Sequence, residues 1–332
     1  MAGRRTNLAL AALLGIAAAS GVVAFGIGTP WVRPVLIAHG LAAVAIIVLA
    51  PWKTAIARRG LKRERHGSPL SILLAALVVV TLISGIAHSV FNLRAVGPVT
   101  VMQVHVTAAV ATVIAGVVHV WQRPQRLRAS DLSRRNFLRS GALAAVAAFG
   151  YIAVETTTKA TGLPGGKRRF TGSHERGSFD PPEMPVTSWL DDTPPTLGAS
   201  HLLTVTSPSG TREMTLDGLT AFDDTVTATL DCTGGWYATQ EWTGVRLDRL
   251  IDATGSSVRV VAATGYERRF PMTDVGDLLL ATHVGGRPLS VGHGAPLRLV
   301  APGRRGFWWV KWVSEIVIDD RPAWWQPPFP LT

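Results

Sequence analysis

Residues 230–247 read LDCTGGWYATQEWTGVRL and contain Cys232, the single cysteine of the 332-residue chain. An apolar, β-branched run from Thr225 to Leu230 comes just before it, so we expect Cys232 at the end of a strand, followed by a turn at Thr233–Gly235. A lone cysteine is usually a small buried apolar residue, but a thiolate is also a soft ligand for transition metals. One cysteine without a nearby His or Cys pair cannot form a structural zinc site, so a core residue and a ligand of another metal remain the two interpretations.

The sequence around this stretch predicts a strand-rich domain over residues 201–332. Short alternating apolar segments are bounded there by Gly, Pro and Asp, as is typical of strands. They are Leu202–Thr206, Thr225–Leu230, Val258–Ala262, Leu297–Val300 and Glu315–Ile318. We therefore expect a mixed α+β fold, without a disulfide framework because only one cysteine is present.

Four segments of this domain resemble, in the same order, the molybdopterin domain of the sulfite oxidase family. The spacing of Cys232, Trp236, Trp242, Gly244 and Leu247 is similar to that around the molybdenum-ligating cysteine, most closely in the bacterial periplasmic protein-methionine-sulfoxide reductases. The other segments are Gly285–Leu289, His293–Arg298, and Gly306-Phe307 with Lys311-Trp312. The resemblance covers roughly residues 170 to 320.

This resemblance implies a molybdenum-molybdopterin cofactor with Cys232 as the catalytic thiolate ligand of the metal. It makes His293, Arg298 and Lys311 contacts of the pterin and its phosphate, for which Arg and Lys are suited because they donate charge-assisted hydrogen bonds. The alternative for Arg298 and Lys311 is solvated charge at a strand edge.

Two further basic residues, Arg304 and Arg305, are candidates for the same phosphate. Gly303 and Gly306 stand on either side of them and would let the backbone approach an anion closely. The nearby tryptophans are expected to form core or pocket walls rather than to take part in chemistry.

The sequence departs from the family directly after the cysteine. Animal and plant sulfite oxidases have arginines closely following it, whereas this chain has Gly235, Trp236 and Tyr237. The sulfoxide reductases have an acidic residue two positions after it, where this chain has Gly234. We expect oxygen-atom transfer, in the direction of reduction of an S-oxide or N-oxide; sulfite oxidation and a metal-free, membrane-anchored binding module are the alternatives.

Residues 1–125 predict a four-helix transmembrane domain. Four nearly charge-free runs have about the length needed to cross a hydrocarbon core. They are Leu8–Ile27, Val35–Trp52, Leu70–Phe91 and Val99–Trp121. A secretory signal is the alternative for the first run alone, because Arg4 and Arg5 precede it.

The net charge of +11 is concentrated at the ends of these runs. Lys and Arg gather at the N-terminus, in residues 53–65 and in residues 123–139, whereas the two other loops contain only Arg33 and Arg94. The positive-inside rule then places the N-terminus in the cytoplasm and the C-terminal domain outside a cell membrane. No nucleic-acid partner is expected, since the C-terminal domain carries little of the excess charge.

Residues 126–158 are expected to carry the chain across the membrane once more. Ser133–Leu138 reads SRRNFL and precedes a short, Ala- and Gly-rich apolar stretch, Gly141–Val154, which resembles an internal twin-arginine export signal. An ordinary fifth transmembrane helix is the alternative. Residues 159–200 are rich in Pro, Gly, Ser and Thr and predict an extended linker.

Four histidines lie within the apolar runs: His39, His88, His105 and His119. Ionisable groups in hydrocarbon are costly and suggest function. His105 and His119 are fourteen residues apart, which is about 21 Å of helix, and this part resembles bis-histidine b-type cytochromes in architecture only. We expect one outer haem b between His105 and either His39 or His88; for an inner site, His119 is the candidate ligand and His66 its candidate partner. Quinone or another membrane carrier would then exchange electrons with the protein.

Overall fold

The computed structural model describes residues 2–61, 68–92, 99–125, 128–188, 192–198, 201–252 and 254–330. The chain divides into two compact units. The helical unit consists of Met1–Phe25 and Pro30–His174, and the C-terminal unit consists of Gly26–Thr29 and Glu175–Thr332. His66 and Arg94 lie outside the described residues.

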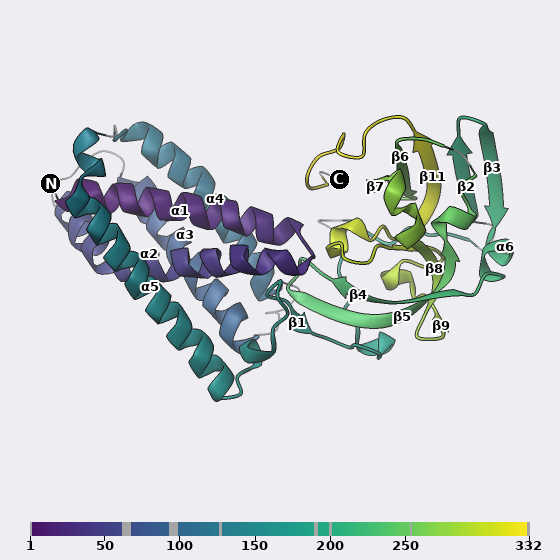
Figure 1. Cartoon of the computed structure of the whole chain (residues 1–332), viewed down its shortest axis with the longest axis horizontal. Helices are drawn as coiled ribbons and strands as arrows, with labels where there is room; N and C mark the ends of the chain where they lie inside the picture. The colour runs from purple at the N-terminus through teal and green to yellow at the C-terminus, as the bar shows by residue number, and fades with distance from the viewer. Residues whose placement is uncertain are drawn as a thin grey trace. The chain divides into compact units, whose positions relative to one another are not determined.

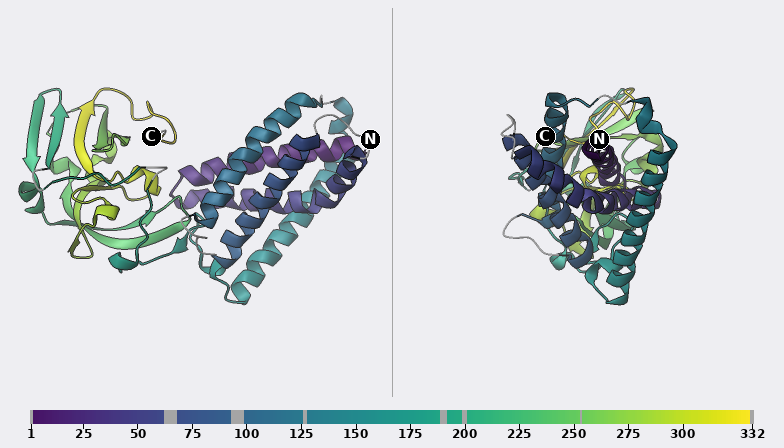
Figure 2. Two further views of the ribbon diagram at one scale, coloured as in Figure 1. Left: turned by 180° about the vertical axis from the view of Figure 1, so that it is seen from behind. Right: turned by 90° about the vertical axis from the view of Figure 1, so that its left-hand side faces the viewer.

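Five long helices make up the helical unit (Figures 1 and 2). They are α1 (Ala2–Gly26), α2 (Arg33–Leu61), α3 (Ser68–Ile86), α4 (Val101–Gln122) and α5 (Arg134–Ala160). All five are long and apolar enough to cross a membrane, and few of their residues are buried within the protein. Outward-facing apolar side chains on every helix suit a lipid surrounding.

The fifth helix is longer than the sequence predicts. Its apolar stretch was expected over Gly141–Val154, but the helix starts at Arg134, inside the twin-arginine segment, and continues to Ala160. The Asn136 side chain donates to the carbonyls of Ser130 and Asp131, both at 3.2 Å, which fixes the turn before the helix. α5 packs against α2, whereas α3 packs against α4 through small buried residues such as Ala108 and Thr112.

The C-terminal unit contains two sheets. One has the order β1-β5-β8-β10, with β4 paired to β5 and β9 to β8, and the other has the order β3-β2-β11-β6-β7. β2 and β11 pair in parallel. The strands are β1 (His174–Glu175), β2 (Leu202–Ser207), β3 (Gly210–Thr215), β4 (Asp224–Asp231), β5 (Trp236–Arg246), β6 (Ser257–Ala262), β7 (Glu267–Pro271), β8 (Leu279–Val284), β9 (Arg287–Pro288), β10 (Arg298–Val300) and β11 (Val313–Asp319). One short α-helix, α6 (Leu216–Thr220), follows β3.

Single turns of 3-10 helix and one π-helical turn connect these elements. The π-helical turn, Ala87–Phe91, continues α3. The 3-10 turns are Pro30–Val32, Ala129–Leu132, Pro164–Lys167, Pro181–Glu183, Leu247–Arg249, Met272–Asp277, Val291–His293 and Gly306–Trp308.

The two sheets share one hydrophobic core. Alternate residues of β5 are buried, as period-two strands require, and Trp242 at its centre is fully buried. Leu280 of β8 and Ile316 of β11 join the same cluster from the two sheets. The strands expected at residues 202–206, 225–230, 258–262, 297–300 and 315–318 are all present, within two residues of the expected ends.

The segment from 159 to 200 differs from the extended linker that its composition predicts. From Glu175 onward it belongs to the C-terminal unit. Its backbone is paired with the sheet, since the Arg176 N–H donates to the Tyr237 carbonyl and the Phe179 N–H to the Thr239 carbonyl, each at 2.8 Å. Backbone groups pair regardless of residue type, so composition did not reveal this attachment.

Candidate active site

Cys232 lies in a tight turn between β4 and β5. Its N–H donates to the Trp236 carbonyl at 2.8 Å, and the Gly235 N–H donates to the Cys232 carbonyl at 3.1 Å. Gly235 has φ +90°, a conformation that glycine adopts without strain. The Gly234 N–H points to Sγ at 3.3 Å. The Thr-Gly-Gly sequence therefore forms the turn that holds the sulfur in place at the end of β4.

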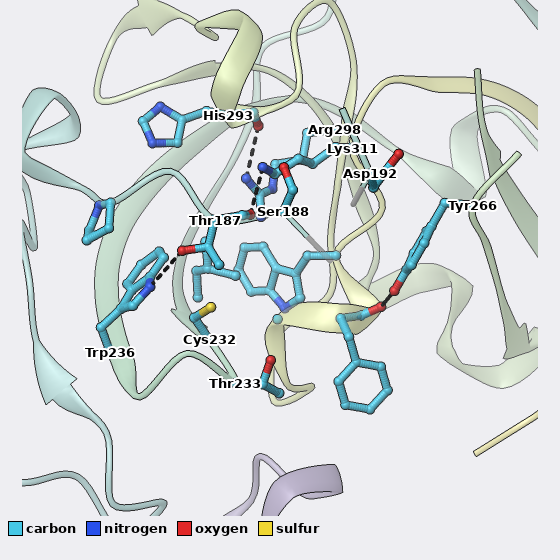
Figure 3. Close-up of a pocket in the computed structure, with 15 residues that line it drawn as sticks. Thr187, Ser188, Asp192, Cys232, Thr233, Trp236, Tyr266, His293, Arg298 and Lys311 are labelled. Carbon is cyan, nitrogen blue, oxygen red and sulfur yellow. Dashed lines mark hydrogen bonds between the residues drawn. The ribbon is translucent and has the colours of Figure 1, made fainter. Parts of the chain in front are cut away.

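The sulfur lies in a pocket that also contains the basic side chains of His293, Arg298 and Lys311 (Figure 3). Burial raises the pKa of the Cys232 thiol, an effect that the Gly234 N–H and Arg305 partly oppose. The other lining residues are Pro185, Thr187, Ser188, Asp192, Leu230, Thr233, Trp236, Tyr266, His293, Arg298, Gly306, Phe307, Trp309 and Lys311. Four residues proposed from the sequence, Cys232, His293, Arg298 and Lys311, are therefore brought together.

Arg298 is the most deeply buried of these cations. It starts β10, is 3% exposed and donates from Nη1 to the His293 carbonyl at 2.9 Å. Its guanidinium carbon lies 5.5 Å and 5.7 Å from the ring centroids of Trp242 and Trp309. Its Nε has no hydrogen-bond partner among the described residues. Burial lowers the pKa of Arg298 to about 10, so the group remains charged at neutral pH.

Lys311 and His293 are held by backbone carbonyls rather than by carboxylates. Lys311 donates from Nζ to the Thr187 carbonyl at 2.9 Å and to the Gly292 carbonyl at 2.7 Å. Burial, and then the charge of Arg298, lower its pKa to about 7. His293 contacts the Met184 carbonyl through Nε2 at 3.1 Å, and burial lowers its pKa as well.

Gly294 explains how the residues around His293 and Lys311 come so close. It has φ +108°, and a Cβ on it would lie 3.2 Å from the Cα and Cβ of Lys311 and 3.2 Å from the Cβ of Arg298. Only glycine fits this combination of backbone conformation and contact.

Arg304 and Arg305 do not line the pocket, contrary to the prediction from the sequence. Arg305 forms a buried ion pair with Asp231 and donates to the Cys232 carbonyl at 3.2 Å, so it holds the cysteine turn from behind. Arg304 forms an ion pair of 2.5 Å with Asp274. Asp231 and Asp274 are distant from Arg304 and Arg305 in sequence, so the sequence contains no sign of these ion pairs. The charge of the two arginines and the glycines beside them therefore predicted a phosphate contact instead.

Thr187, Asp192 and Tyr266 line the pocket but were not predicted. Thr187 accepts a hydrogen bond from Trp236 Nε1 at 3.1 Å. The Tyr266 hydroxyl donates to the Phe307 carbonyl, and burial raises its pKa. The segment that contains Thr187 and Asp192 looked like a linker by composition; the only signal in the sequence was that the family resemblance begins before it.

Comparison with known proteins finds a family model that matches most of the pocket. Residues 192–325 match the family described as oxidoreductase molybdopterin binding domain. Cys232, His293, Arg298 and Lys311 lie within this match, whereas Pro185, Thr187 and Ser188 lie before it. The match supports an oxidoreductase that binds molybdopterin, as the sequence predicts.

The curated relatives are sulfite oxidases and similar proteins at low identity. Mitochondrial sulfite oxidase of Rattus norvegicus is 26% identical over 198 residues, which cover 44% of this chain and 36% of that protein. The Drosophila melanogaster enzyme is 27% identical over 146 residues, covering 33% and 26%. The crystal structure of the sulfane dehydrogenase SoxCD from Paracoccus pantotrophus is 28% identical, with a TM-score of 0.36, and the match covers 39% of this chain and 40% of that one. The chain thus spans about a third of the length of the curated relatives.

The residues around Cys232 fit the molybdopterin group that the matched family model names. Cys232 offers one soft ligand, and the described residues contain no cluster of three His, Cys, Asp or Glu that could complete a coordination sphere. The remaining ligands must then come from a non-protein group such as a dithiolene. Arg298 and Lys311 form no salt bridge within the described ranges, although both are largely buried. The Asp192 carboxylate in the same pocket does raise the pKa of Lys311, whereas Cys232 is the group that raises the pKa of Arg298. Arg298, a buried cation without a carboxylate partner in the described residues, calls for a bound anion.

The histidines proposed as haem ligands lie in the helical unit, away from the pocket residues in sequence. His39 and His105 face each other with ring centroids 6.0 Å apart. His88 lies instead against His174, with centroids 4.9 Å apart. His119 lies on α4 and belongs to no group of three or more His, Cys, Asp or Glu side chains in the part of the chain that the structure describes. The structure thus selects His39 over His88 as the neighbour of His105.

Proposed function

We propose that this chain is a membrane-anchored molybdenum oxidoreductase that transfers an oxygen atom to or from a small sulfur or nitrogen compound. The observation that carries the proposal is the Cys232 sulfur in one pocket with Arg298 and Lys311, inside the matched oxidoreductase domain. When bound, molybdenum-molybdopterin would supply the two-electron oxygen-atom transfer.

The residues of this chain would position the cofactor and the substrate. Cys232 would give the thiolate ligand, while Arg298 and Lys311 would offer charge-assisted donors to the anionic part of the cofactor. Trp236 and Trp309 give aromatic walls, and Thr187 and Tyr266 add hydroxyl groups near them. Gly235, Trp236 and Tyr237 follow the cysteine where sulfite oxidases have arginines that help hold the anionic substrate, which argues against sulfite as the substrate.

Reduction of an S-oxide is the direction that we favour. Such a substrate accepts two electrons and two protons and yields a sulfide and water. Five helices of membrane-spanning length would anchor the protein in the cell membrane, with quinone or another membrane carrier as the electron source. Sulfite oxidation with electrons passed to the membrane is the second candidate, because two of the relatives are sulfite oxidases.

The test is purification of the full chain from the membranes of a host that makes molybdopterin. We expect molybdenum in a ratio to protein on the order of one, and oxidation of a reduced dye by methyl sulfoxides rather than reduction of an acceptor by sulfite. Cys232→Ser should lower both the metal content and the turnover by at least about 100-fold while leaving membrane insertion intact.

Thr227→Ser is the matched control, since it also changes one side chain of the β4 region but on its exposed face. Full turnover in Cys232→Ser would reject the ligand assignment. A chain without molybdenum in such a host would leave the metal-free binding module.

A further inference from the structure

The helical unit contains an internal repeat. Ser20-Gly21 in α1 is followed by His39-Gly-Leu-Ala-Ala-Val44 in α2, and Ser84-Gly85 in α3 is followed by His105-Val-Thr-Ala-Ala-Val110 in α4. The Ser-Gly pairs are 64 residues apart (84 − 20) and the histidines 66 (105 − 39). The pair α1–α2 thus corresponds to the pair α3–α4.

The repeated residues make the same contacts in both halves. His39 Nδ1 lies 2.9 Å from the carbonyl oxygen of Ala17, and His105 Nδ1 lies 2.9 Å from that of Thr81. Each carbonyl belongs to the residue four positions before the glycine of its half. The hydroxyls of Ser20 and Ser84 also match, since each donates at 2.6 Å to the carbonyl four residues earlier.

The glycines of the repeat lie against the two imidazole rings. A Cβ on Gly21 would come within 3.3 Å of the His39 ring, and a Cβ on Gly85 within 3.0 Å of the His105 ring. Further along, the equivalent positions Ile46 and Thr112 are both buried in the unit. Two unrelated helical hairpins would not share a carbonyl, a serine, a glycine and a histidine in one arrangement.

The contacts leave the same ring nitrogen unused on both histidines. A hydrogen bond from Nδ1–H to a carbonyl fixes the tautomer in which Nε2 has a lone pair, as in metal-ligating histidines. In the described segments, neither Nε2 has a hydrogen-bond partner. The rings are nearly perpendicular, at 80°, with centroids 6.0 Å apart. Metal–imidazole bonds are about 2.0–2.1 Å, so this spacing is of the size that one metal bonded to both rings requires.

We propose that His39 and His105, one from each half of this repeat, are the two axial ligands of a single haem. Two protein nitrogens leave the equatorial positions of the metal to a non-protein ligand, because no third His, Cys, Asp or Glu joins them within the described residues. A porphyrin supplies those positions, and its apolar faces suit a site among helices of this hydropathy. The site stands independently of the molybdenum chemistry; only its use as the electron route to the pocket rests on the proposed function.

Absorption spectroscopy of the purified full chain tests the site. We expect a b-type band in the reduced-minus-oxidised spectrum and a haem-to-chain ratio on the order of one. His39→Ala and His105→Ala should each reduce that ratio at least about tenfold, while His88→Ala and His119→Ala keep it. Haem-free protein, or a haem lost in His88→Ala or His119→Ala but retained in His39→Ala, would overturn the proposal.

A second pair of variants covers the case in which the alanine variants do not accumulate. His39→Met and His105→Met replace the imidazole with an apolar thioether that can also bind iron. Each variant should retain haem with a more positive midpoint potential. A potential unchanged in both variants would contradict axial ligation. Molybdenum content, measured on every sample, reports on the other unit, so that loss of haem with molybdenum retained separates this proposal from the proposed function.

Discussion

At the scale of single residues, the pocket is defined by Arg298, a cation that forms no ion pair with an acid of the described residues. Arg298 is buried with its Nε unsatisfied, and the nearest charges that act on it are Cys232 and other basic groups. A buried charge of this kind is costly until an anion binds to it. The free-energy cost of burying Arg298 in the cofactor-free chain and the gain when an anion binds to it can be measured separately.

Arg298→Met should therefore weaken cofactor retention without weakening the fold of the cofactor-free chain. Losing charge-assisted hydrogen bonds costs about 1.5–3 kcal/mol, or roughly 10–100-fold in affinity. Molybdenum per chain after dialysis measures the first effect, and thermal unfolding of cofactor-free protein measures the second. The exposed Arg287→Met is the matched control. If both quantities fell together, Arg298 would be a structural residue.

Lys311 should make cofactor retention dependent on pH. Its pKa without an anion is about 7, chiefly because of burial. A bound anion stabilises the charged form and raises that pKa, so affinity should fall as the pH rises above about 7. Molybdenum retained after dialysis between about pH 6 and pH 9 gives the profile.

Two substitutions at this position provide the comparison. Lys311→Arg, charged throughout this range, should flatten the profile, and Lys311→Met should lower it at every pH. A profile that keeps its slope in Lys311→Arg would mean that another group titrates.

At the scale of secondary-structure elements, the turn after Cys232 and the strand β5 that follows it hold the cysteine in position. Gly244 lies where β5 pairs with β8 at a register shift beside Thr243. A Cβ on Gly244 would be 2.1 Å from the Leu280 carbonyl oxygen and 2.7 Å from the Ala281 Cα, both of them backbone atoms. The two strands cannot keep their spacing around any side chain at this position.

Gly244→Ala should accordingly destabilise the C-terminal unit by about 3 kcal/mol or more. For a domain of this size, that lowers the melting temperature by roughly 2–4 °C per kcal/mol. Gly218→Ala, in helix α6 and with only ordinary contact to Thr215, is the control and should change it little. Unaltered melting in Gly244→Ala would mean that β5 and β8 separate locally at low cost.

The parts of the fold that could be predicted are those that depend on local side-chain patterns. Alternating apolar residues are a local signal, and the strands at 202–206 and 315–318 were predicted from it. The attachment of residues 175–188 to the sheet uses backbone hydrogen bonds, which leave no pattern in side chains. Likewise, Lys311 and Arg305 looked equivalent in sequence, but Asp231, 74 positions away, turns Arg305 from the pocket toward the cysteine turn.

At the scale of the whole chain, we predict that the five helices of spanning length in the described residues each cross a membrane, which would put residues 2 and 330 on opposite sides of it. The basic segments then predict an N-terminus in the cytoplasm and a C-terminal unit outside. Alkaline phosphatase fused after residue 330 should be active, and the same enzyme fused within residues 53–59 inactive. The reverse pattern would refute this topology.

The twin-arginine segment should control export of the C-terminal unit. Arg134→Lys with Arg135→Lys should lower the fraction of the C-terminal unit accessible to external protease by about tenfold. The exposed pair Arg58→Lys with Arg59→Lys is the control, as it keeps the same charge in another basic segment. Equal accessibility in both double variants would mean that α5 inserts as an ordinary membrane helix.

Thr187 belongs to the segment Pro185–Ser188, which lines the pocket. Two hydrogen bonds hold this segment in place: Lys311 donates to the Thr187 carbonyl, and Trp236 donates to the Thr187 hydroxyl. We expect these two hydrogen bonds to slow the entry or release of a large group that binds beneath the segment. Loading would then belong to the last moments of folding, before the protein leaves the compartment where the cofactor is made. A molecule exported empty would have little opportunity to be filled afterwards, which makes the order of assembly, as much as affinity, the determinant of how much active protein reaches its destination.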